Sequence, residues 1–466
     1  MTKVVLIDPP TSAPTQEPLL SLGYLSATLK QTGHEVLILE GNGPPKRSRS
    51  FLLSAIKDFM PTFIGITLTI DNIPATYAWI DWLKKETKIP IVAGGPHATA
   101  CPHEVQQHVD FVAVGEGESY LKKILKADKT IILENAVREG PLIENLDTIP
   151  FPDRSKIHHT ESIFSSRGCP YNCTYCSSHA VFGRKYRTRS SKNVSDEIYE
   201  LAAAGTRHIK FEDDEAFVNP KRTDELLEEL SKYKGLTFSA RIRIDNITLP
   251  KLLKMKAAGF VRLAVGVESY VDYTLKEINK GYTSSDIITA KEDLNASGIS
   301  YHFNLMMGFP WEQPYNMYHF PIQGFTSVVT PIPYPGTALY NEYHAQYGFT
   351  DWWLDPKMNH LEPTPKAFFR LFASNMWALY KPERFWNHSN AMKTQIEWIC
   401  ESLLIQNLNQ TFSNKLSLFL SNLTMASLRI WRNSPPRERL LFWGFGLLIR
   451  ILGLHKRASF GSKVPK

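Results

Sequence analysis

Short apolar runs alternate with amphipathic helical stretches through the first third of the chain. The runs are rich in β-branched residues and lack polar alternation, as expected for parallel strands that are buried on both faces. They lie at residues 4–7, 35–39, 63–68, 89–93 and 111–114. The helical stretches between them lie at residues 19–30, 51–59 and 76–86. Strands that alternate with helices predict a doubly wound, Rossmann-like α/β sheet, which binds ligands beyond the carboxyl ends of its strands.

The same alternation returns after a stretch rich in proline and turn residues at 140–154. Strands are predicted at 208–211, 237–243, 261–265 and 301–307, with Phe164 in the first strand of the series. Helices are predicted at 195–204, 224–232, 250–258 and 285–297. This rhythm fits a partial, TIM-like (βα)6 barrel, in which catalytic loops lie at the carboxyl ends of the strands.

These patterns divide the chain into four parts. We expect a doubly wound domain at 1–135, a linker at 136–160, a barrel core at 161–340 and a helical region at 341–466. The last part is rich in tryptophan and phenylalanine, and these aromatic residues form either core or the lining of a substrate pocket over the barrel mouth.

Residues 440–449 of the last part are ten consecutive apolar residues, and Arg450, Lys456 and Arg457 follow them. This run is too short to span a bilayer. It predicts an amphipathic helix at about 438–454 that either lies in a membrane interface, as a peripheral contact, or docks on the protein.

Composition and charge narrow the class of protein. Of the 466 residues, 43% are hydrophobic and 21% are charged, which is ordinary for two or three globular domains. The net charge of +7 is modest and no basic–aromatic block occurs, so we expect no nucleic-acid partner. The N-terminus shows no signal-peptide pattern, and Cys101 and Cys400 are isolated outside the one cysteine motif. A reducing, cytoplasmic location without a disulfide framework is therefore predicted.

The strongest chemical signal is a group of three cysteines, Cys169, Cys173 and Cys176, in a C-x3-C-x2-C spacing. Three thiolates on one short loop suit an iron–sulfur cluster whose last iron stays open. A structural zinc site, with His179 as the fourth ligand, is the alternative. The loop and the βα pattern after it resemble the radical S-adenosylmethionine (radical SAM) superfamily. The resemblance implies that the three cysteines hold a [4Fe-4S] cluster, that the open iron binds S-adenosylmethionine, and that Tyr175 packs beside the adenine.

Polar groups at the predicted strand ends extend this resemblance. Asp213 lies in an acidic turn that the family places near the amino group of S-adenosylmethionine, although a solvated turn is the simpler interpretation. Arg243 ends a strand where the family often has an arginine facing the ligand carboxylate, and Arg241 shares its side by alternation. Glu268 and Ser269 match the family's G-x-E-S element, in which the glutamate accepts from the ribose hydroxyls.

Two further segments resemble the end of the radical SAM core. Gly308 begins a turn that is similar to the family's G-x-P-G-E turn beside the adenine, with Trp311 in place of the last glycine. Residues 333–337 resemble the closing P-x-P-G-T segment.

Glycine-rich turns follow two strands of the first domain. Gly94, Gly95 and His97 lie in the first turn, and Gly115 and Glu116 lie in the second. Glycines let the backbone approach a large ligand closely, although either turn alone is a weak signal. Together with residues 18–24 and 33–36, these turns resemble the cobalamin-binding domain found ahead of many radical SAM cores. The resemblance implies that the five residues contact cobalamin.

The first domain departs from the methyltransferase and mutase type of cobalamin domain. That type carries a D-x-H-x-x-G motif, whose histidine binds cobalt from below, whereas the loop after the first strand here is residues 8–11, Asp-Pro-Pro-Thr. His97 is therefore predicted as a loop contact near the corrin and not as a metal ligand.

The resemblance implies an enzyme that uses a [4Fe-4S] cluster, S-adenosyl-L-methionine and cobalamin. Its simplest activity is methyl transfer to an unactivated carbon, through a 5′-deoxyadenosyl radical and methylcobalamin. An oxidative cyclase or a rearrangement enzyme with the same cofactors, but without methyl transfer, is the alternative. A methylthiotransferase needs three more cluster cysteines, which Cys101 and Cys400 cannot supply. The expected partners are a small-molecule substrate, with a hydrophobic or lipid-like one among the options, and a low-potential electron donor such as flavodoxin or ferredoxin.

Overall fold

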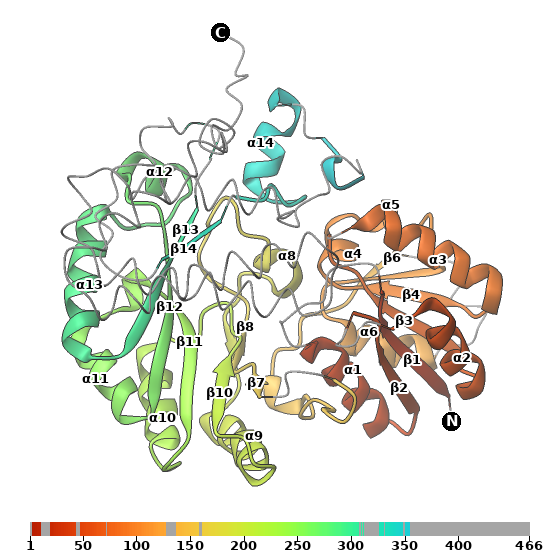
Figure 1. Cartoon of the computed structure of the whole chain (residues 1–466), viewed down its shortest axis with the longest axis horizontal. Helices are drawn as coiled ribbons and strands as arrows, with labels where there is room; N and C mark the ends of the chain where they lie inside the picture. Colours follow the sequence, from red (N-terminus) through yellow and green to blue (C-terminus); the bar gives the residue numbers. More distant parts are fainter. Residues whose placement is uncertain are drawn as a thin grey trace, which may run out of the picture. The chain divides into compact units, whose positions relative to one another are not determined.

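The computed structural model describes residues 2–10, 19–42, 47–70, 72–126, 137–157, 161–306, 309, 311, 326–329, 331–347 and 350–354. The chain divides into two compact units. The first comprises Met1–Tyr301, Met306–Trp311 and Thr330–Glu362, and the second comprises His302–Leu305, Glu312–Val329 and Pro363–Lys466. The first unit contains the predicted first domain and most of the predicted barrel core, and the described residues of the site below lie in it. Figure 1 shows the helices and strands of the described residues.

The first sheet has six parallel strands among the described residues, in the order β2-β1-β3-β4-β5-β6. They are β1 (Lys3–Asp8), β2 (Glu35–Glu40), β3 (Phe63–Thr67), β4 (Ile91–Gly94), β5 (Phe111–Val114) and β6 (Val137–Glu139). The helices of this part are α1 (Leu20–Gln31), α2 (Arg49–Phe59), α3 (Ile73–Thr87), α4 (Pro96–Ala100), α5 (Pro102–Val105) and α6 (Gly117–Lys126). The strand order reverses between β1 and β3, and this switch point is where such sheets open a crevice for ligands.

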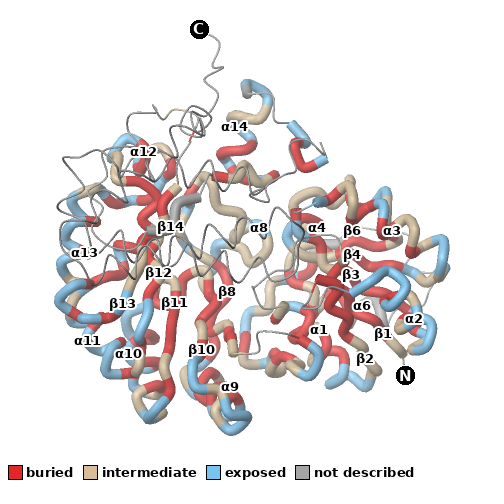
Figure 2. The backbone as a smooth tube through the Cα atoms, in the orientation of Figure 1, coloured by how far each residue is buried: buried red, intermediate tan, exposed pale blue. Residues whose placement is uncertain are grey.

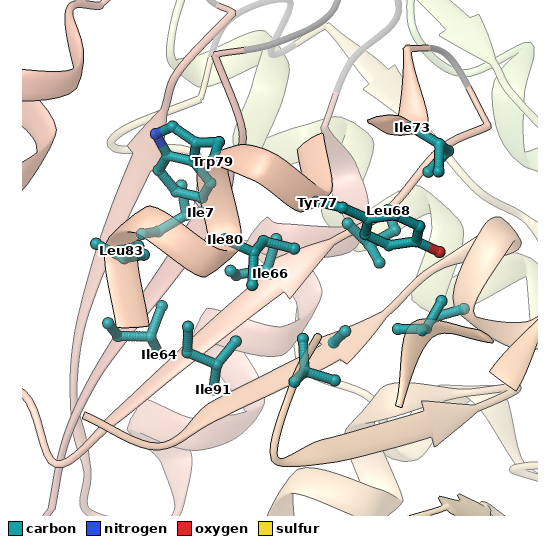
Figure 3. Packing of buried hydrophobic residues seen from close by; sticks show 14 of the residues in the cluster. Ile7, Ile64, Ile66, Leu68, Ile73, Tyr77, Trp79, Ile80, Leu83 and Ile91 are labelled. Atoms are coloured by element: carbon teal, nitrogen blue, oxygen red, sulfur yellow. The ribbon is translucent and has the colours of Figure 1, made fainter. Parts of the chain in front are cut away.

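Alternating strand residues build two cores on opposite faces of this sheet. Val4 and Leu6 pack with α1 and α6 on one face, whereas Val5 and Ile7 pack with α2 and α3 on the other. Figure 3 shows side chains of α3 lying against those of the neighbouring strands, and Trp79 is fully buried there. Helices on both faces confirm the predicted doubly wound fold. The sixth strand, β6, was not predicted, because three residues that include Arg138 and Glu139 carry no apolar pattern.

The second sheet follows the order β12-β11-β10-β7 through the first unit, with parallel pairing throughout. The strands are β7 (Ser162–Ile163), β10 (His208–Phe211), β11 (Thr237–Arg243) and β12 (Phe260–Glu268), and β13 (Ser300–Met306) and β14 (Thr326–Val329) come later in the chain. The helices are α9 (Ser191–Ala203), α10 (Pro220–Leu230), α11 (Leu249–Ala257), α12 (Asp272–Glu277), α13 (Ser284–Ser297) and α14 (Ala338–Tyr347). Phe211, Phe238 and Phe260 pack together with ring centroids 5.5–6.0 Å apart.

Several predicted boundaries move because of helix caps. The helix predicted to begin at residue 224 begins at Pro220, since the Asn219 side chain accepts the backbone N–H of Arg222. The helix predicted from residue 195 begins at Ser191, because Ser190 caps it in the same way. Phe164 was wrongly placed in a strand, as β7 ends one residue earlier at Ile163.

A two-stranded antiparallel ribbon interrupts the parallel pattern. It pairs β8 (Ser166–Arg167) with β9 (Arg187–Thr188) and closes a loop of residues 168–186. This loop contains the three cysteines and the short helix α8 (Ser178–Phe182). The ribbon is largely buried, as the tube in Figure 2 shows near the label β8.

Little of the predicted helical region at 341–466 falls within the described residues. α14 runs into it, and a turn of 3-10 helix at Trp352–Leu354 follows. Trp352 and Trp353 are buried in the core that includes α3 of the first domain. The predicted interfacial helix at 438–454 lies outside the described residues. Among the helices of the described part, none combines the length and the apolar character that crossing a bilayer requires.

Candidate active site

The cysteine loop is held in place by backbone hydrogen bonds from several elements. The N–H of Cys169 donates to the carbonyl of Gly183 at 3.4 Å, and that of Thr174 donates to Ile278 at 3.1 Å. The N–H of Cys176 donates to the carbonyl of Cys173 at 3.2 Å, which closes a turn between these two ligands. The loop therefore presents its three thiols from a fixed backbone.

The environment of the thiols is consistent with a cluster. Burial raises the pKa of Cys169 to about 11, and burial likewise raises the pKa of the Cys176 thiol. The charges of Cys173 and Cys176 raise the pKa of Cys169, and the charge of Cys173 raises the pKa of Cys176, so the three sulfurs lie near one another. An iron–sulfur cluster would hold them as thiolates.

The distances between the ligand atoms distinguish a site for a cluster from a site for a single metal ion. Among the described residues, the three-ligand group whose atoms all lie within 4.8 Å of one another is His97, Cys101 and Glu104. Neither the three motif cysteines nor a set that includes His179 forms such a group. The arrangement thus suits a cluster with several irons and does not support the zinc alternative.

Arg243 lies directly against the cysteine loop. Its Nη1 donates to Cys173 Sγ at 3.3 Å, and its guanidinium stacks on the Tyr171 ring at 3.6 Å. Nε and Nη2 donate to the Asp245 carboxylate at 3.0 and 3.1 Å, and the side chain is 8% exposed. Arg241 is instead 43% exposed and pairs with Glu212 at 3.0 Å. The structure therefore brings Arg243, and not Arg241, to the cysteines.

Glu268 ends β12 in a strained backbone conformation. Its φ of +65° lies in the left-handed region, which a residue other than glycine seldom adopts unless its surroundings hold it there. Its Oε1 lies 3.4 Å from Lys280 Nζ, and the same amine donates to Tyr175 Oη at 3.4 Å. Lys280 is only 3% exposed. Ser269, also buried, accepts the N–H of Val271 at 3.1 Å and so fixes the turn after Glu268.

The acidic turn after β10 divides its carboxylates between two roles. Asp213 accepts the N–H of Ser165 at 3.0 Å and the hydroxyls of Ser165 and Ser166, all of them buried. Burial raises the pKa of Asp213. Asp214 is the carboxyl that faces the cysteines, because its charge raises the pKa values of Cys169 and Cys176. The predicted contact of Asp213 with S-adenosylmethionine stays a prediction.

An aromatic group lies beside Tyr175. The ring centroid of Tyr175 is 6.4 Å from that of Phe309, and the Phe309 ring stacks on Trp311 at 5.2 Å. Tyr343 of α14 tilts against Trp311 at 5.6 Å. This wall is suited to a flat, apolar group such as adenine. Gly308, which was predicted in the same turn, lies outside the described residues.

In the first domain, the turn after β4 is shaped by Gly95. Its φ of +96° and ψ of −176° define a conformation that essentially only glycine adopts. A Cβ there would also meet Leu68 O and Thr67 Oγ1 at 2.9 Å. Gly94 ends β4, and His97 follows in α4 with 2% exposure. Its Nε2 lies 3.1 Å from both Tyr77 Oη and Glu104 Oε1.

These contacts bear on His97 as a contact of cobalamin. Because Nε2 already lies within hydrogen-bonding distance of Tyr77 and Glu104, only Nδ1, which is buried and has no partner in the structure, is available to a ligand. The role of His97 as a loop contact near the corrin stays a prediction.

Replacing Gly95 by alanine is expected to destabilise the first domain by about 1–3 kcal/mol, since strain and a steric clash add up there. Gly33→Ala is the matched control. Gly33 also has a positive φ, of +84°, but nothing lies within 4 Å of a Cβ built on it. Thermal unfolding should show a clearly larger loss for Gly95→Ala. Equal losses would mean that the close packing around Gly95 contributes nothing.

A cavity of about 240 Å³ joins the two parts of the site. Loops at the carboxyl end of the first sheet contribute Ile70 and His97, and α8 contributes Ala180 and Val181. Tyr334, from the predicted closing segment at 333–337, also lines it. The helix that follows the last cluster cysteine thus shares one cavity with the ligand-facing loops of the first domain.

The second glycine turn, after β5, also reaches toward α8. Gly115 has a φ of +80°, and its N–H donates to Thr99 Oγ1 at 3.1 Å. Glu116 is 2% exposed, and both of its oxygens contact arginines of the core, Arg167 and Arg187, at 3.0–3.1 Å. Its role as a cobalamin contact stays a prediction, and the structure gives its carboxylate partners on the protein.

The site combines a doubly wound domain with a cysteine loop beside a second parallel sheet, an arrangement that suits an enzyme with bound cofactors. Comparison with known families agrees with this. The model of the radical SAM superfamily matches residues 163–320, and that of the B12 binding domain matches residues 11–125. The chain therefore belongs to the radical SAM enzymes that carry a cobalamin-binding domain, and its cofactors are a [4Fe-4S] cluster, S-adenosylmethionine and cobalamin.

Curated relatives cover most of the chain. An uncharacterised methyltransferase of Pyrococcus horikoshii is 29% identical over 72% of this chain and 82% of its own length. The hopanoid C-3 methylase of Methylococcus capsulatus is 24% identical, over 79% and 77%. The anaerobic magnesium-protoporphyrin IX monomethyl ester cyclase of Cereibacter sphaeroides is 25% identical, over 75% and 64%.

Two solved structures share the fold. The radical S-adenosylmethionine methyltransferase TsrM of Kitasatospora setae, with cobalamin and a [4Fe-4S] cluster bound, superimposes with a TM-score of 0.62 at 20% identity, over 74% of this chain and 78% of that one. The cobalamin-dependent radical enzyme OxsB, with aqua-cobalamin bound, gives 0.65 at 16% identity, over 98% and 76%.

Sequence patterns missed several residues of this site. Lys280 belongs to no motif, and its exposed neighbours Asn279 and Gly281 give no local pattern that marks it as buried. Asp214 was grouped with Asp213 without a distinction between them. Arg167 and Arg187 lie in strands of two residues, which are too short to show a period.

Proposed function

We propose that this chain is a cobalamin-dependent radical SAM methyltransferase that transfers a methyl group to an unactivated carbon of a small molecule. The observation that carries the proposal is the shared cavity, since α8 of the cluster loop and the cobalamin-domain loops line the same space. The names of two relatives, the methyltransferase of Pyrococcus horikoshii and the hopanoid C-3 methylase, support methyl transfer. The cyclase relative keeps cyclisation without methyl transfer as the second candidate.

When bound, the cofactors supply an electron, a 5′-deoxyadenosyl radical and a transferable methyl group, while the protein supplies orientation and excludes water. Cys169, Cys173 and Cys176 would hold the cluster irons. Arg243 would donate a charge-assisted hydrogen bond to the Cys173 sulfur. Cys173 and Arg243 are buried, which keeps bulk water from the Cys173 sulfur.

The nucleotide would lie between β12 and the aromatic wall. Glu268 is proposed to accept from the ribose hydroxyls, with its backbone fixed by Ser269. Tyr175 and the turn that includes Gly308 are proposed to flank the adenine. Lys280 would orient the Glu268 carboxylate through their contact at 3.4 Å.

Lys280→Met is expected to weaken the binding of S-adenosylmethionine by about 2 kcal/mol, or roughly 30-fold, because it leaves a buried carboxylate without its partner. Lys276→Met is the control, as Lys276 is exposed on α12. Equilibrium dialysis of the reconstituted proteins measures the affinity. If Lys280→Met binds the ligand as tightly as Lys276→Met, the proposed support of Glu268 is wrong.

The electron donor is proposed to be a low-potential protein of the flavodoxin or ferredoxin type. A peripheral membrane contact is proposed through residues 438–454, because an apolar run followed by basic residues favours an anionic bilayer surface. The full chain should then sediment with anionic liposomes and not with zwitterionic ones. A chain that stays in the supernatant in both cases would leave the docked helix as the interpretation.

The experiment that tests methyl transfer uses S-adenosylmethionine whose methyl group carries three deuterium atoms. The anaerobically reconstituted enzyme is incubated with it, a chemical reductant and a small-molecule extract. A methyltransferase should give a product that carries the intact labelled methyl group, detected by mass spectrometry. A cyclase or rearrangement enzyme should release 5′-deoxyadenosine and labelled methionine, and its substrate-derived product should carry no label. The Cys173→Ala protein serves as the blank.

A further inference from the structure

The β8–β9 ribbon, called the neck of the cluster loop below, contains two buried arginines. Arg167 and Arg187 are partners in the register of the β8–β9 ribbon, one on each side of the loop at residues 168–186. Their side chains are 7% and 2% exposed. Like charges directly opposite each other across two strands are destabilising, and burial increases the cost. The ribbon therefore requires an external source of negative charge.

That charge comes from the turn after β5 in the cobalamin-binding domain. Glu116 lies between the two guanidiniums, with Oε1 3.1 Å from Arg167 Nη1 and 3.0 Å from Arg187 Nη1. Glu118 Oε1 accepts from Arg167 Nη2 at 2.6 Å and is also buried. Two carboxylates thus balance two guanidiniums in a buried, hydrogen-bonded network, and such pairing compensates part of the cost of burying the charges.

Further contacts tie the network to its surroundings. The guanidinium of Arg167 lies 5.5 Å from the rings of both Tyr24 and Phe182, one from each domain. Arg187 Nη2 donates to the carbonyl of Phe182 at 2.8 Å, at the end of α8. Glu116 Oε2 also accepts the N–H of Ile143, in the predicted linker, at 2.6 Å.

The same turn is connected to the loops that face the cobalamin site. The N–H of Gly115 donates to Thr99 Oγ1, which belongs to α4 next to His97. A Cβ on Gly115 would lie 3.7 Å from the carbonyl of Val181 in α8. The four residues at 115–118 are therefore in contact with α4 on one side and with the cluster loop on the other.

We propose that Glu116 and Glu118 are positioning residues that clamp the neck of the cluster loop and thereby fix the cluster relative to the cobalamin site. Methyl transfer and radical chemistry alike depend on such a fixed relation between cofactors, since a small misplacement of reacting groups costs much of the rate. The inference rests on the presence of both cofactors and not on the proposed methyl transfer.

The test measures the relation between the two cofactors in the holoenzyme. Reduced cluster and cob(II)alamin are both paramagnetic, and a fast-relaxing cluster shortens the spin–lattice relaxation time of a nearby cob(II)alamin. Glu116→Gln is expected to weaken this relaxation enhancement severalfold, with iron and cobalamin contents unchanged. Glu118→Gln, which keeps the carboxylate between the arginines, should give a smaller change in the same direction and serves as the readout if Glu116→Gln does not fold.

Glu144→Gln is the matched control. Glu144 pairs with Lys185, which belongs to the cluster loop, but both side chains are more than 60% exposed. Exposed pairs of this kind contribute little, so the relaxation of cob(II)alamin should match the wild type. Wild-type relaxation in the folded Glu116 and Glu118 variants, or an equal change in Glu144→Gln, would overturn the proposal. None of these outcomes depends on which product the enzyme forms.

Discussion

Cys173→Ala is expected to abolish the release of 5′-deoxyadenosine and to reduce the iron content of the reconstituted protein. Cys173 is the most buried of the three cysteines, and its sulfur accepts from Arg243. Two thiolates cannot hold the remaining irons of a cluster that needs three protein ligands. Iron analysis and chromatography of the nucleoside products measure the two effects.

The control for this substitution is Cys101→Ala. Cys101 lies in the first domain beside His97, outside the cluster loop, and should be dispensable for iron binding. A Cys173→Ala protein that keeps both its iron and its nucleoside product would contradict the cluster assignment. A Cys101→Ala protein that keeps its iron and its nucleoside product is what the assignment predicts.

Arg243→Gln is expected to lower activity by about 10- to 100-fold, the usual effect of removing a residue that supports a metal ligand. It should also make the reduction potential of the cluster more negative. A positive charge next to Cys173 favours the reduced cluster, which carries the additional electron, so removal of that charge lowers the potential. Redox titration followed by electron paramagnetic resonance measures the shift.

Two variants separate charge from packing at this position. Arg243→Lys keeps the charge but loses the planar fork that reaches Asp245, so it should restore part of the potential and little of the activity. Arg241→Gln, two residues earlier on β11 and half-buried in a pair with Glu212, should change neither quantity. A potential in Arg243→Gln equal to that of the wild type would show that the guanidinium does not act on the cluster.

The sequence predicted the first domain well, because buried parallel strands have continuous apolar runs such as residues 4–7. The cysteine motif predicted the cluster for a similar reason, as the spacing itself brings three thiols together. Glu268 was predicted as a nucleotide contact because it lies in a motif at the end of a strand. Local patterns of this kind are sufficient to predict a feature that is formed by residues close together in the sequence.

Features built from distant segments could not be predicted in this way. Arg167 and Arg187 pair across a loop, and Glu116 from another domain neutralises them. No local pattern in the sequence indicates that contact. The Glu116 turn was predicted to face a cofactor, since polar groups at strand ends often do. Which side of a turn a carboxylate faces is decided by tertiary packing, and the same holds for Lys280 beneath Glu268.

The most direct test of the account is the stoichiometry of the two nucleoside products during substrate turnover. The enzyme is reconstituted with cobalamin and incubated anaerobically with S-adenosylmethionine and a low-potential reductant. Its substrate is the one that the deuterium-labelling experiment identifies. We expect 5′-deoxyadenosine and S-adenosylhomocysteine in equal amounts, because each methyl transfer consumes one S-adenosylmethionine as radical source and one as methyl donor. Release of 5′-deoxyadenosine without S-adenosylhomocysteine would contradict methyl transfer and favour the cyclase activity.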